Sequence, residues 1–140
     1  MVVRKQNIED YIPHRFPFVM IDNLLNVSAE RFESDFFIDK NNILVQNNIF
    51  QEAGLMENIA QTCAASFGYL DRAENENPKI GFIGAISRLI VHELPSVNLK
   101  INTIVTPTHQ LGNIYMVLGQ NFLDGHLLME CEMKIVISEG

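Results

Sequence analysis

Apolar residues near the N-terminus follow two patterns. Residues 7–12 are typical of a short helix capped by Asn7, and Pro13 ends it because the residue before a proline disfavours helical geometry. Val19–Val27 is rich in apolar and branched residues, which indicates a strand. From Arg31 apolar and polar side chains alternate, so a second strand should follow, with one solvated face. Its other side carries Phe32, Ser34, Phe36 and Ile38. The two strands predict a hairpin.

The middle of the chain predicts one buried helix. Residues from Gln51 to about Leu70 are apolar on nearly every side of a helical projection, so we expect this helix to be surrounded by protein. The pairs Asn41-Asn42 and Asn47-Asn48 indicate a loop before it. The polar run over 71–79 predicts an exposed connection after it.

The second half of the chain predicts four long strands. We expect them over Ile80–His92, Val97–Thr106, Asn113–Leu123 and His126–Ser138. Asp124-Gly125 is typical of a two-residue hairpin turn, which needs positive φ at both central positions. In the last strand Met129, Cys131, Met133, Ile135 and Ile137 alternate with Glu130, Glu132 and Lys134. We therefore predict a single α+β domain over residues 1–140, in which a curved antiparallel sheet wraps around the central helix.

Composition narrows the possible functions. The chain has 140 residues, 47% of them hydrophobic, which is enough for one domain with its own core. Seventeen acidic and ten basic residues give a formal charge of −7, which opposes binding to nucleic-acid phosphates. No apolar run approaches the ~20 residues that span a bilayer, and the N-terminus lacks a signal-peptide core. We expect a cytoplasmic protein with no membrane or nucleic-acid partner. Cys63 and Cys131 lie in apolar segments and should be buried free thiols.

Two ionisable residues are candidates for catalysis. Glu57 is a single carboxylate on a helix that is otherwise mostly apolar, and an isolated charge is costly to bury. Burial should raise the pKa of Glu57, which suits a general acid. His14 lies in a turn bracketed by prolines and, with an ordinary pKa of ~6.5, suits a general base. The structural alternative is that Glu57 lies on a narrow polar strip with Asn58 and Gln61, while His14 bonds the backbone.

Other chemistries are not favoured. His92, His109 and His126 are scattered at predicted strand ends and turns, without the spacing of metal ligands. No serine lies in a Gly-x-Ser-x-Gly motif. Residues 81–84 have neither the spacing nor the following helix of a nucleotide-binding loop. Metal, serine-hydrolase and phosphate-binding functions therefore have no support.

Three segments resemble motifs of one enzyme family. Residues 11–22, Tyr-Ile-Pro-His-Arg-Phe-Pro-Phe-Val-Met-Ile-Asp, resemble the Pro-His-Arg-x-Pro-Phe-x-x-x-Asp signature of the 3-hydroxyacyl-acyl-carrier-protein dehydratases, which have the hot-dog fold. Residues 57–61, Glu-Asn-Ile-Ala-Gln, look like that family's Glu-x-x-Ala-Gln on the central helix. Residues 84–89 are similar to its Gly-x-x-x-x-Arg-Phe strand, shortened by one position. The order and spacing of the motifs cover most of the chain.

The resemblance implies a reaction and the residues that perform it. In the family a histidine and a glutamate act together across a dimer interface, and the matching residues here are His14 and Glu57. They would remove water from a 3-hydroxyacyl thioester of acyl carrier protein or coenzyme A, giving a trans-2-enoyl thioester. His14 would take the α proton and Glu57 would protonate the departing hydroxyl. The expected substrate-binding positions are Ala53 and Gly54, at the start of the helix, and Gly84. The resemblance implies no metal and no organic cofactor.

The segment before the helix departs from the family pattern. The family has Gly-His-Phe-Pro there and Pro-Gly at the helix entry, whereas residues 47–54 are Asn-Asn-Ile-Phe-Gln-Glu-Ala-Gly. Such a variant resembles the dehydratase-like proteins that accompany aryl polyene or flexirubin pigment synthesis. Two other functions stay open: a hot-dog acyl thioesterase, and a non-catalytic acyl-binding or partner subunit.

Assembly is expected as well. A curved sheet around one helix leaves a long edge strand uncovered, which predicts an isologous homodimer or a dimer of dimers. An acidic carrier protein would dock on a basic patch. Its candidates are Arg15, Arg72, Lys79, Arg88 and Lys100.

Overall fold

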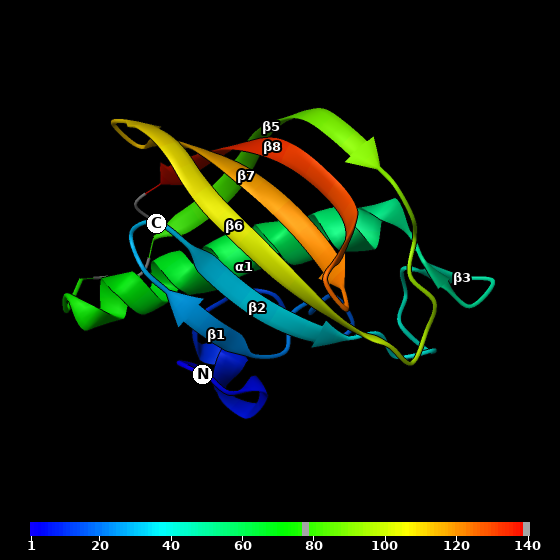
Figure 1. The fold of residues 1–140 in the computed structure, drawn as a ribbon. Helices are drawn as coiled ribbons and strands as arrows, with labels where there is room; N and C mark the ends of the chain where they lie inside the picture. Colours follow the sequence, from blue (N-terminus) through cyan, green and yellow to red (C-terminus); the bar gives the residue numbers. More distant parts are fainter. Residues whose placement is uncertain (77–78, 139–140) are drawn as a thin grey trace.

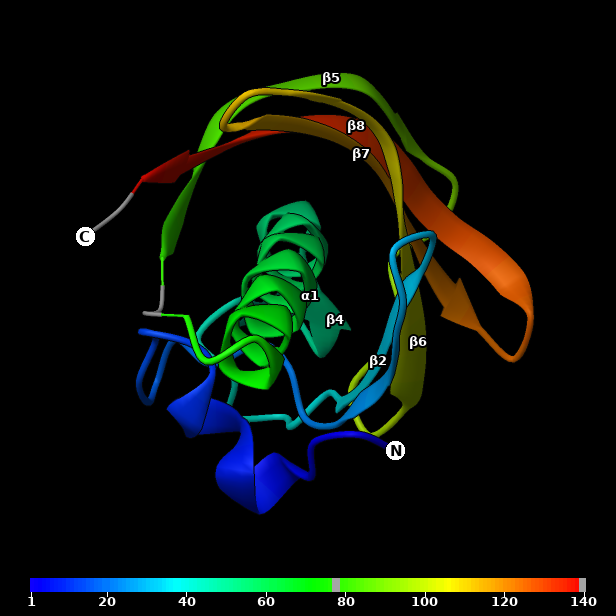
Figure 2. The same cartoon turned by 90° about the vertical axis from the view of Figure 1, so that its left-hand side faces the viewer.

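One antiparallel sheet curls around a single long helix in the computed structural model of the chain, which describes residues 1–76 and 79–138 (Figure 1). The six strands are ordered β1-β2-β6-β7-β8-β5 across the sheet. Their bounds are β1 Leu24–Val27, β2 Phe32–Phe37, β5 Ile80–Val91, β6 Lys100–Leu111, β7 Ile114–Leu123 and β8 His126–Ser138. The helix α1, Glu52–Ala73, lies in the concavity, and the N-terminal segment lies on its other side (Figure 2). The predicted α+β architecture is confirmed.

The core lies between α1 and the concave face of the sheet. Leu55 and Ile59 of the helix are fully buried there. From β8 every second residue packs against them, as the alternation predicts: Met129, Cys131, Met133 and Ile135. Gly119 of β7 allows this close approach, because a Cβ at that position would lie 2.4 Å from the Ile59 side chain. Cys63 and Cys131 are free and buried, as expected.

The predicted hairpin of β1 and β2 is present, with shorter strands. The alternating residues of β2, Phe32, Ser34 and Phe36, are buried. Asp35, on the opposite face, is also buried, and its Oδ1 accepts hydrogen bonds from the backbone and side-chain nitrogens of Asn23. Residues 19–23, which the sequence predicts as strand, lie outside β1.

The loop before α1 contains a hairpin that the sequence analysis did not predict. Its strands are β3, Val45–Gln46, and β4, Ile49–Phe50. Asn47 and Asn48 form the turn, with φ of 53° and 60°. Positive φ at both central residues is the geometry of a type I′ turn, and asparagine tolerates it better than most residues. The predicted turn at Asp124-Gly125 has the same feature, with φ of 48° and 83°.

Other boundaries moved by a few residues. The N-terminal helix is the 3₁₀ helix η1, Lys5–Asp10, and no side chain caps it, so the expected role of Asn7 is wrong. Asp71–Ala73 belongs to α1 rather than to the connection. Residues 77–78 of that connection lie outside the described part. β6 extends to Leu111, so His109 lies within a strand.

β5 is the strand that the rest of the molecule covers least. It lies at the end of the sheet and pairs only with β8 among the described strands. Large apolar side chains along it are between 38% and 56% exposed: Ile80, Phe82, Ile83, Ile86, Leu89 and Ile90. The chain therefore has the uncovered edge that the sequence predicts. The helices in the described ranges are too short, or insufficiently apolar, to cross a membrane.

Candidate active site

His14 and Glu57 meet within one chain. Nε2 of His14 lies 3.4 Å from Oε1 of Glu57, and the two side chains are 30% and 36% exposed. The pair is therefore half-buried but open to a ligand from solvent. This contact differs from the expected pairing, in which each of two subunits supplies one residue, because the turn that carries His14 folds back onto α1 of the same chain.

Side-chain amides of α1 form hydrogen bonds with residues 18–20, which follow the turn that carries His14 and are called the His14 segment below. Asn58 donates to the carbonyl oxygen of Met20 at 2.7 Å. Oε1 of Gln61 accepts from the Met20 amide at 2.7 Å, and Nε2 of Gln61 donates to the carbonyl oxygen of Phe18 at 2.8 Å. Buried backbone groups need partners, and here helix side chains replace a neighbouring strand. This explains why the backbone around Met20 is not part of a strand despite its strand-like composition, whereas Asp22 and Asn23 still bond the backbone of Asp35 in β2.

Gln61 also reaches the carboxylate. Its Nε2 donates to Oε1 of Glu57 at 3.0 Å. The hydrogen bond with His14 holds the pKa of Glu57 below its usual value; burial acts in the opposite direction but is outweighed, and the Gln61 hydrogen bond lowers the pKa further. The raised pKa predicted from burial is therefore wrong. In the free site Glu57 is a carboxylate at neutral pH.

The polar strip on α1 is real and continues into the core. Oδ1 of Asn58 accepts hydrogen bonds from Oγ1 of Thr103 and Nδ2 of Asn121. One turn further along the helix, Oγ1 of Thr62 donates to the Asn58 carbonyl oxygen. Sequence reasoning found the strip but missed Thr103 and Asn121, which lie on β6 and β7 far along the chain. The bonds from Asn58 to the two strands fix the rotation of α1 at the position of Glu57.

The turn that carries His14 is braced by Arg15. Its guanidinium donates to the carbonyl oxygens of Ile12 and His14, at 2.8 and 2.7 Å, and its Nε lies 3.1 Å from a carboxylate oxygen of Glu9. Nδ1 of His14 is buried and has no hydrogen-bond partner within the described chain. The structural alternative, in which His14 bonds the backbone, is therefore not found.

The three expected substrate-binding positions differ in their surroundings. Ala53 is exposed in the first turn of α1. The amide of Gly54 donates to the carbonyl oxygen of Gln51 at 2.9 Å, and a Cβ on Gly54 would lie 2.3 Å from the Phe50 ring. Packing against Phe50 thus accounts for this glycine. Gly84 lies at an irregularity in the pairing of β5 with β8.

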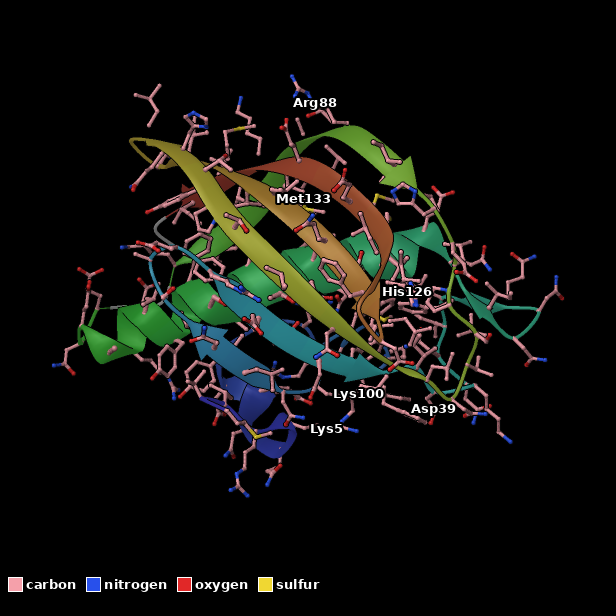
Figure 3. All side chains as sticks on the ribbon, viewed as in Figure 1. Lys5, Asp39, Arg88, Lys100, His126 and Met133 are labelled. Carbon is pink, nitrogen blue, oxygen red and sulfur yellow. The ribbon has the colours of Figure 1, made fainter. Side chains whose placement is uncertain are left out.

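The five basic candidates do not form a free patch. Arg15, Lys79, Arg88 and Lys100 each lie within 4 Å of a carboxylate, and Arg72 stacks over the Tyr11 ring. Figure 3 shows Arg88 projecting outward beside β5, far from Lys5 and Lys100 at the opposite side of the molecule. Arg88 and Lys100 therefore do not belong to one patch.

Comparisons with known proteins agree with this architecture. A chain of the dehydratase heterocomplex ApeI:P from Xenorhabdus doucetiae superposes with a TM-score of 0.84 at 15% identity, covering 92% of this chain and 89% of that one. A hypothetical thioesterase from Streptococcus pneumoniae, solved with coenzyme A, gives a TM-score of 0.67 at 8% identity over 84% of this chain and 88% of its own. These similarities identify the hot-dog fold.

Sequence similarity is more specific. The 3-hydroxyacyl-[acyl-carrier-protein] dehydratase FabZ of Campylobacter lari is 21% identical over 93% of this chain and 94% of its own length. The enzyme of the same name from Wolinella succinogenes is 23% identical over 99% and 98%. Residues 6–106 match the family model of the ApeP-like dehydratases. The chain therefore belongs to the ApeP-like dehydratase family, and the resemblance seen in its motifs is confirmed.

Proposed function

We propose that this chain removes water from a 3-hydroxyacyl thioester, giving a trans-2-enoyl thioester, with His14 and Glu57 as its acid–base pair. The observation that carries the proposal is the 3.4 Å contact between His14 Nε2 and Glu57 Oε1 in a half-open site of a dehydratase-family chain. Dehydration needs one group that accepts the α proton and one that protonates the hydroxyl. Two titratable groups in contact satisfy this need.

The pair works with one shared proton. Glu57 enters as a carboxylate, so the proton that it gives to the hydroxyl reaches it through the His14 contact. His14 then accepts the α proton of the substrate, the double bond forms between the α and β carbons, and the protonated hydroxyl leaves as water. The α proton replaces the proton that was given away. The pair therefore returns to its starting state without a net gain or loss of protons.

The thioester carbonyl needs a hydrogen-bond donor while the α proton is removed. The amides of the first helical turn and the positive end of the helix dipole serve developing negative charge well. The Gly54 amide already donates to Gln51, so the exposed turn at Ala53 is the better candidate of the two. Gly84 lies on β5 and would contact the substrate once this strand pairs with a second chain.

A second hot-dog chain is the proposed partner at β5. An edge strand with six exposed apolar side chains favours association, because pairing with another strand would satisfy its free backbone groups and bury those side chains. A homodimer, or a dimer of dimers, satisfies this edge. The X. doucetiae relative was solved as a heterocomplex, which makes a different hot-dog chain the alternative partner. The substrate is proposed to be carried by acyl carrier protein, as in the names of the FabZ relatives, with coenzyme A as the other thiol.

The test is an activity assay with matched variants. Formation or hydration of the conjugated enoyl thioester is followed by its absorbance, for wild type, His14→Ala and Glu57→Gln. Each substitution should lower kcat by at least ~10²-fold, because general acid–base groups contribute about that much. His126→Ala is the control, since His126 is exposed at the start of β8, and it should leave the rate unchanged.

Other results would point to the alternatives. Release of free thiol from an acyl thioester would indicate the thioesterase. A wild type that is inactive across acyl chain lengths and on both thiol carriers would indicate the non-catalytic subunit.

A further inference from the structure

Gln61 uses every hydrogen-bonding group that its side chain offers. It is fully buried. Oε1 accepts from the Met20 amide, while the two N–H groups of Nε2 donate to the Phe18 carbonyl oxygen and to Oε1 of Glu57. One side chain thus joins the backbone that follows His14 to the carboxylate that His14 contacts.

The orientation of this amide is fixed by its partners. Turning it over would place its oxygen against the Phe18 carbonyl and the Glu57 carboxylate, which are both acceptors. The same rotation would place the NH₂ group against the Met20 amide, which is a donor. Because an amide has distinct donor and acceptor ends, only one orientation satisfies all three partners. The N–H that points at Glu57 is therefore held in place.

The two oxygens of Glu57 are in different surroundings. Oε1 receives both contacts, from Gln61 at 3.0 Å and from His14 at 3.4 Å. Oε2 has no hydrogen bond or ion pair to any residue in the described ranges, and the side chain is 36% exposed. The carboxylate is thus anchored through one oxygen, and the other is available to a ligand.

We propose that Gln61 is a positioning residue, which anchors Oε1 of Glu57 to the backbone of the His14 segment and so holds this oxygen in contact with Nε2 of His14. This inference rests on the proposed function for its catalytic meaning. The anchoring of Glu57 by Gln61 does not depend on that function. Gln61 does not touch the reacting atoms and acts through the carboxylate.

Two substitutions separate positioning from simple packing. Gln61→Glu keeps an acceptor for the Met20 amide but loses both donors and places a second carboxylate beside Glu57. Gln61→Met removes the hydrogen bonds while keeping the volume and adding no charge. Thr62→Val is the matched control: Thr62 is buried on the same helix and bonds Ser34 and the Asn58 carbonyl oxygen, but neither Glu57 nor the His14 segment.

The expected result has two parts. Carbon NMR of the Glu57 carboxyl should show its pKa raised in both Gln61 variants, more in Gln61→Glu, because the donor is lost and a like charge is added. In the dehydration assay kcat should fall at least ~10-fold with little change in KM, and the acidic limb of the pH profile should move to higher pH. Thr62→Val should lower thermal stability without moving either titration.

The NMR titration distinguishes the two proposals. If wild type lacks dehydratase activity but Gln61→Met still raises the pKa of Glu57, the dehydratase proposal fails and the anchoring stands. If Glu57 titrates as in wild type in Gln61→Met, or if Thr62→Val moves it as far, the anchoring by Gln61 is refuted.

Discussion

Residues 18–20 and β5 lie on different sides of α1 and are completed in opposite ways. The first segment is not a strand, yet three of its backbone groups bond to Asn58 and Gln61. β5 is a strand of 12 residues, yet one of its edges is unpaired within the described chain and its apolar side chains are exposed. Whether a segment is a strand therefore does not tell whether its backbone hydrogen bonds are complete within one chain. The contact between His14 and Glu57 is formed within one chain, whereas the sheet keeps an unpaired edge.

The largest expected effect tests whether the pair is self-contained. His14→Ala and Glu57→Gln are each expected to be inactive, and mixing them with subunit exchange should restore nothing. Every chain would lack one member of a pair that forms within that chain. The measurement is the enoyl absorbance assay on the mixture, with mixed wild type as the reference. Recovery toward about a quarter of the wild-type rate would show instead that each site takes its residues from two chains, because half of the dimers would be mixed and each mixed dimer would hold one competent site of two.

The next effect tests whether the sheet is incomplete. Phe82→Glu should weaken association by roughly 10- to 100-fold, because burying a phenylalanine contributes about 1.5–3 kcal/mol. Phe82 is 56% exposed on β5, and Leu111, which is 80% exposed at the end of β6, provides the control Leu111→Glu. Sedimentation should give a 15.9 kDa species for the first variant and the assembled mass for the control. A wild type that is monomeric at micromolar concentration would remove the proposed β5 interface.

The smallest expected effect concerns the contribution of Asp22, which follows the His14 segment, to the free energy of unfolding. Burial raises the pKa of Asp22 above its unfolded value, although its Oδ2 accepts a hydrogen bond from the Phe37 amide at 2.8 Å. The stabilising contribution of such a group is complete below the unfolded pKa and is lost as pH rises through the folded pKa. Asp22→Asn keeps an acceptor for Phe37, so it should be as stable as wild type or up to about 1 kcal/mol more stable at neutral pH. Urea unfolding between pH 4 and 7 measures this difference.

The stability contributed by Glu57 should change with pH in the opposite direction, which provides the control. Its pKa is lowered, so its contribution is present above the unfolded value and is lost as pH falls through the folded pKa. Glu57→Gln should therefore flatten the stability curve on the acidic side. If Asp22→Asn destabilises the protein more as pH rises, the sign assigned to Asp22 is wrong.

The elements that local signals define were predictable from the sequence. The apolar helix, the alternation of β8 and the Asp124-Gly125 turn depend on residues that are close together in the chain. Residues 19–23 were not predictable in this way. Their composition is that of a strand, but the groups that bond to Met20 come from 38 and 41 residues further along the chain.

The candidate site shows the same division. His14 and Glu57 could be selected as an unusual histidine and an unusual carboxylate, supported by the family motifs. Their contact within one chain and the direction of the Glu57 pKa could not be predicted, because both depend on distances set by Gln61 and the His14 turn. Burial alone, which the helix pattern does indicate, predicts the wrong direction.

The hairpin before α1 limits how this chain can be engineered. Phe50 is fully buried, with its ring centroid 5.7 Å from that of Phe36, and its ring fills the space beside Gly54. Grafting the Gly-His-Phe-Pro motif of the family pattern onto this position would remove the β3–β4 pairing and disturb a core aromatic at the same time. Such a graft must replace the hairpin and repack the core around it together, so single substitutions toward that pattern should unfold this end of α1 before they change its chemistry.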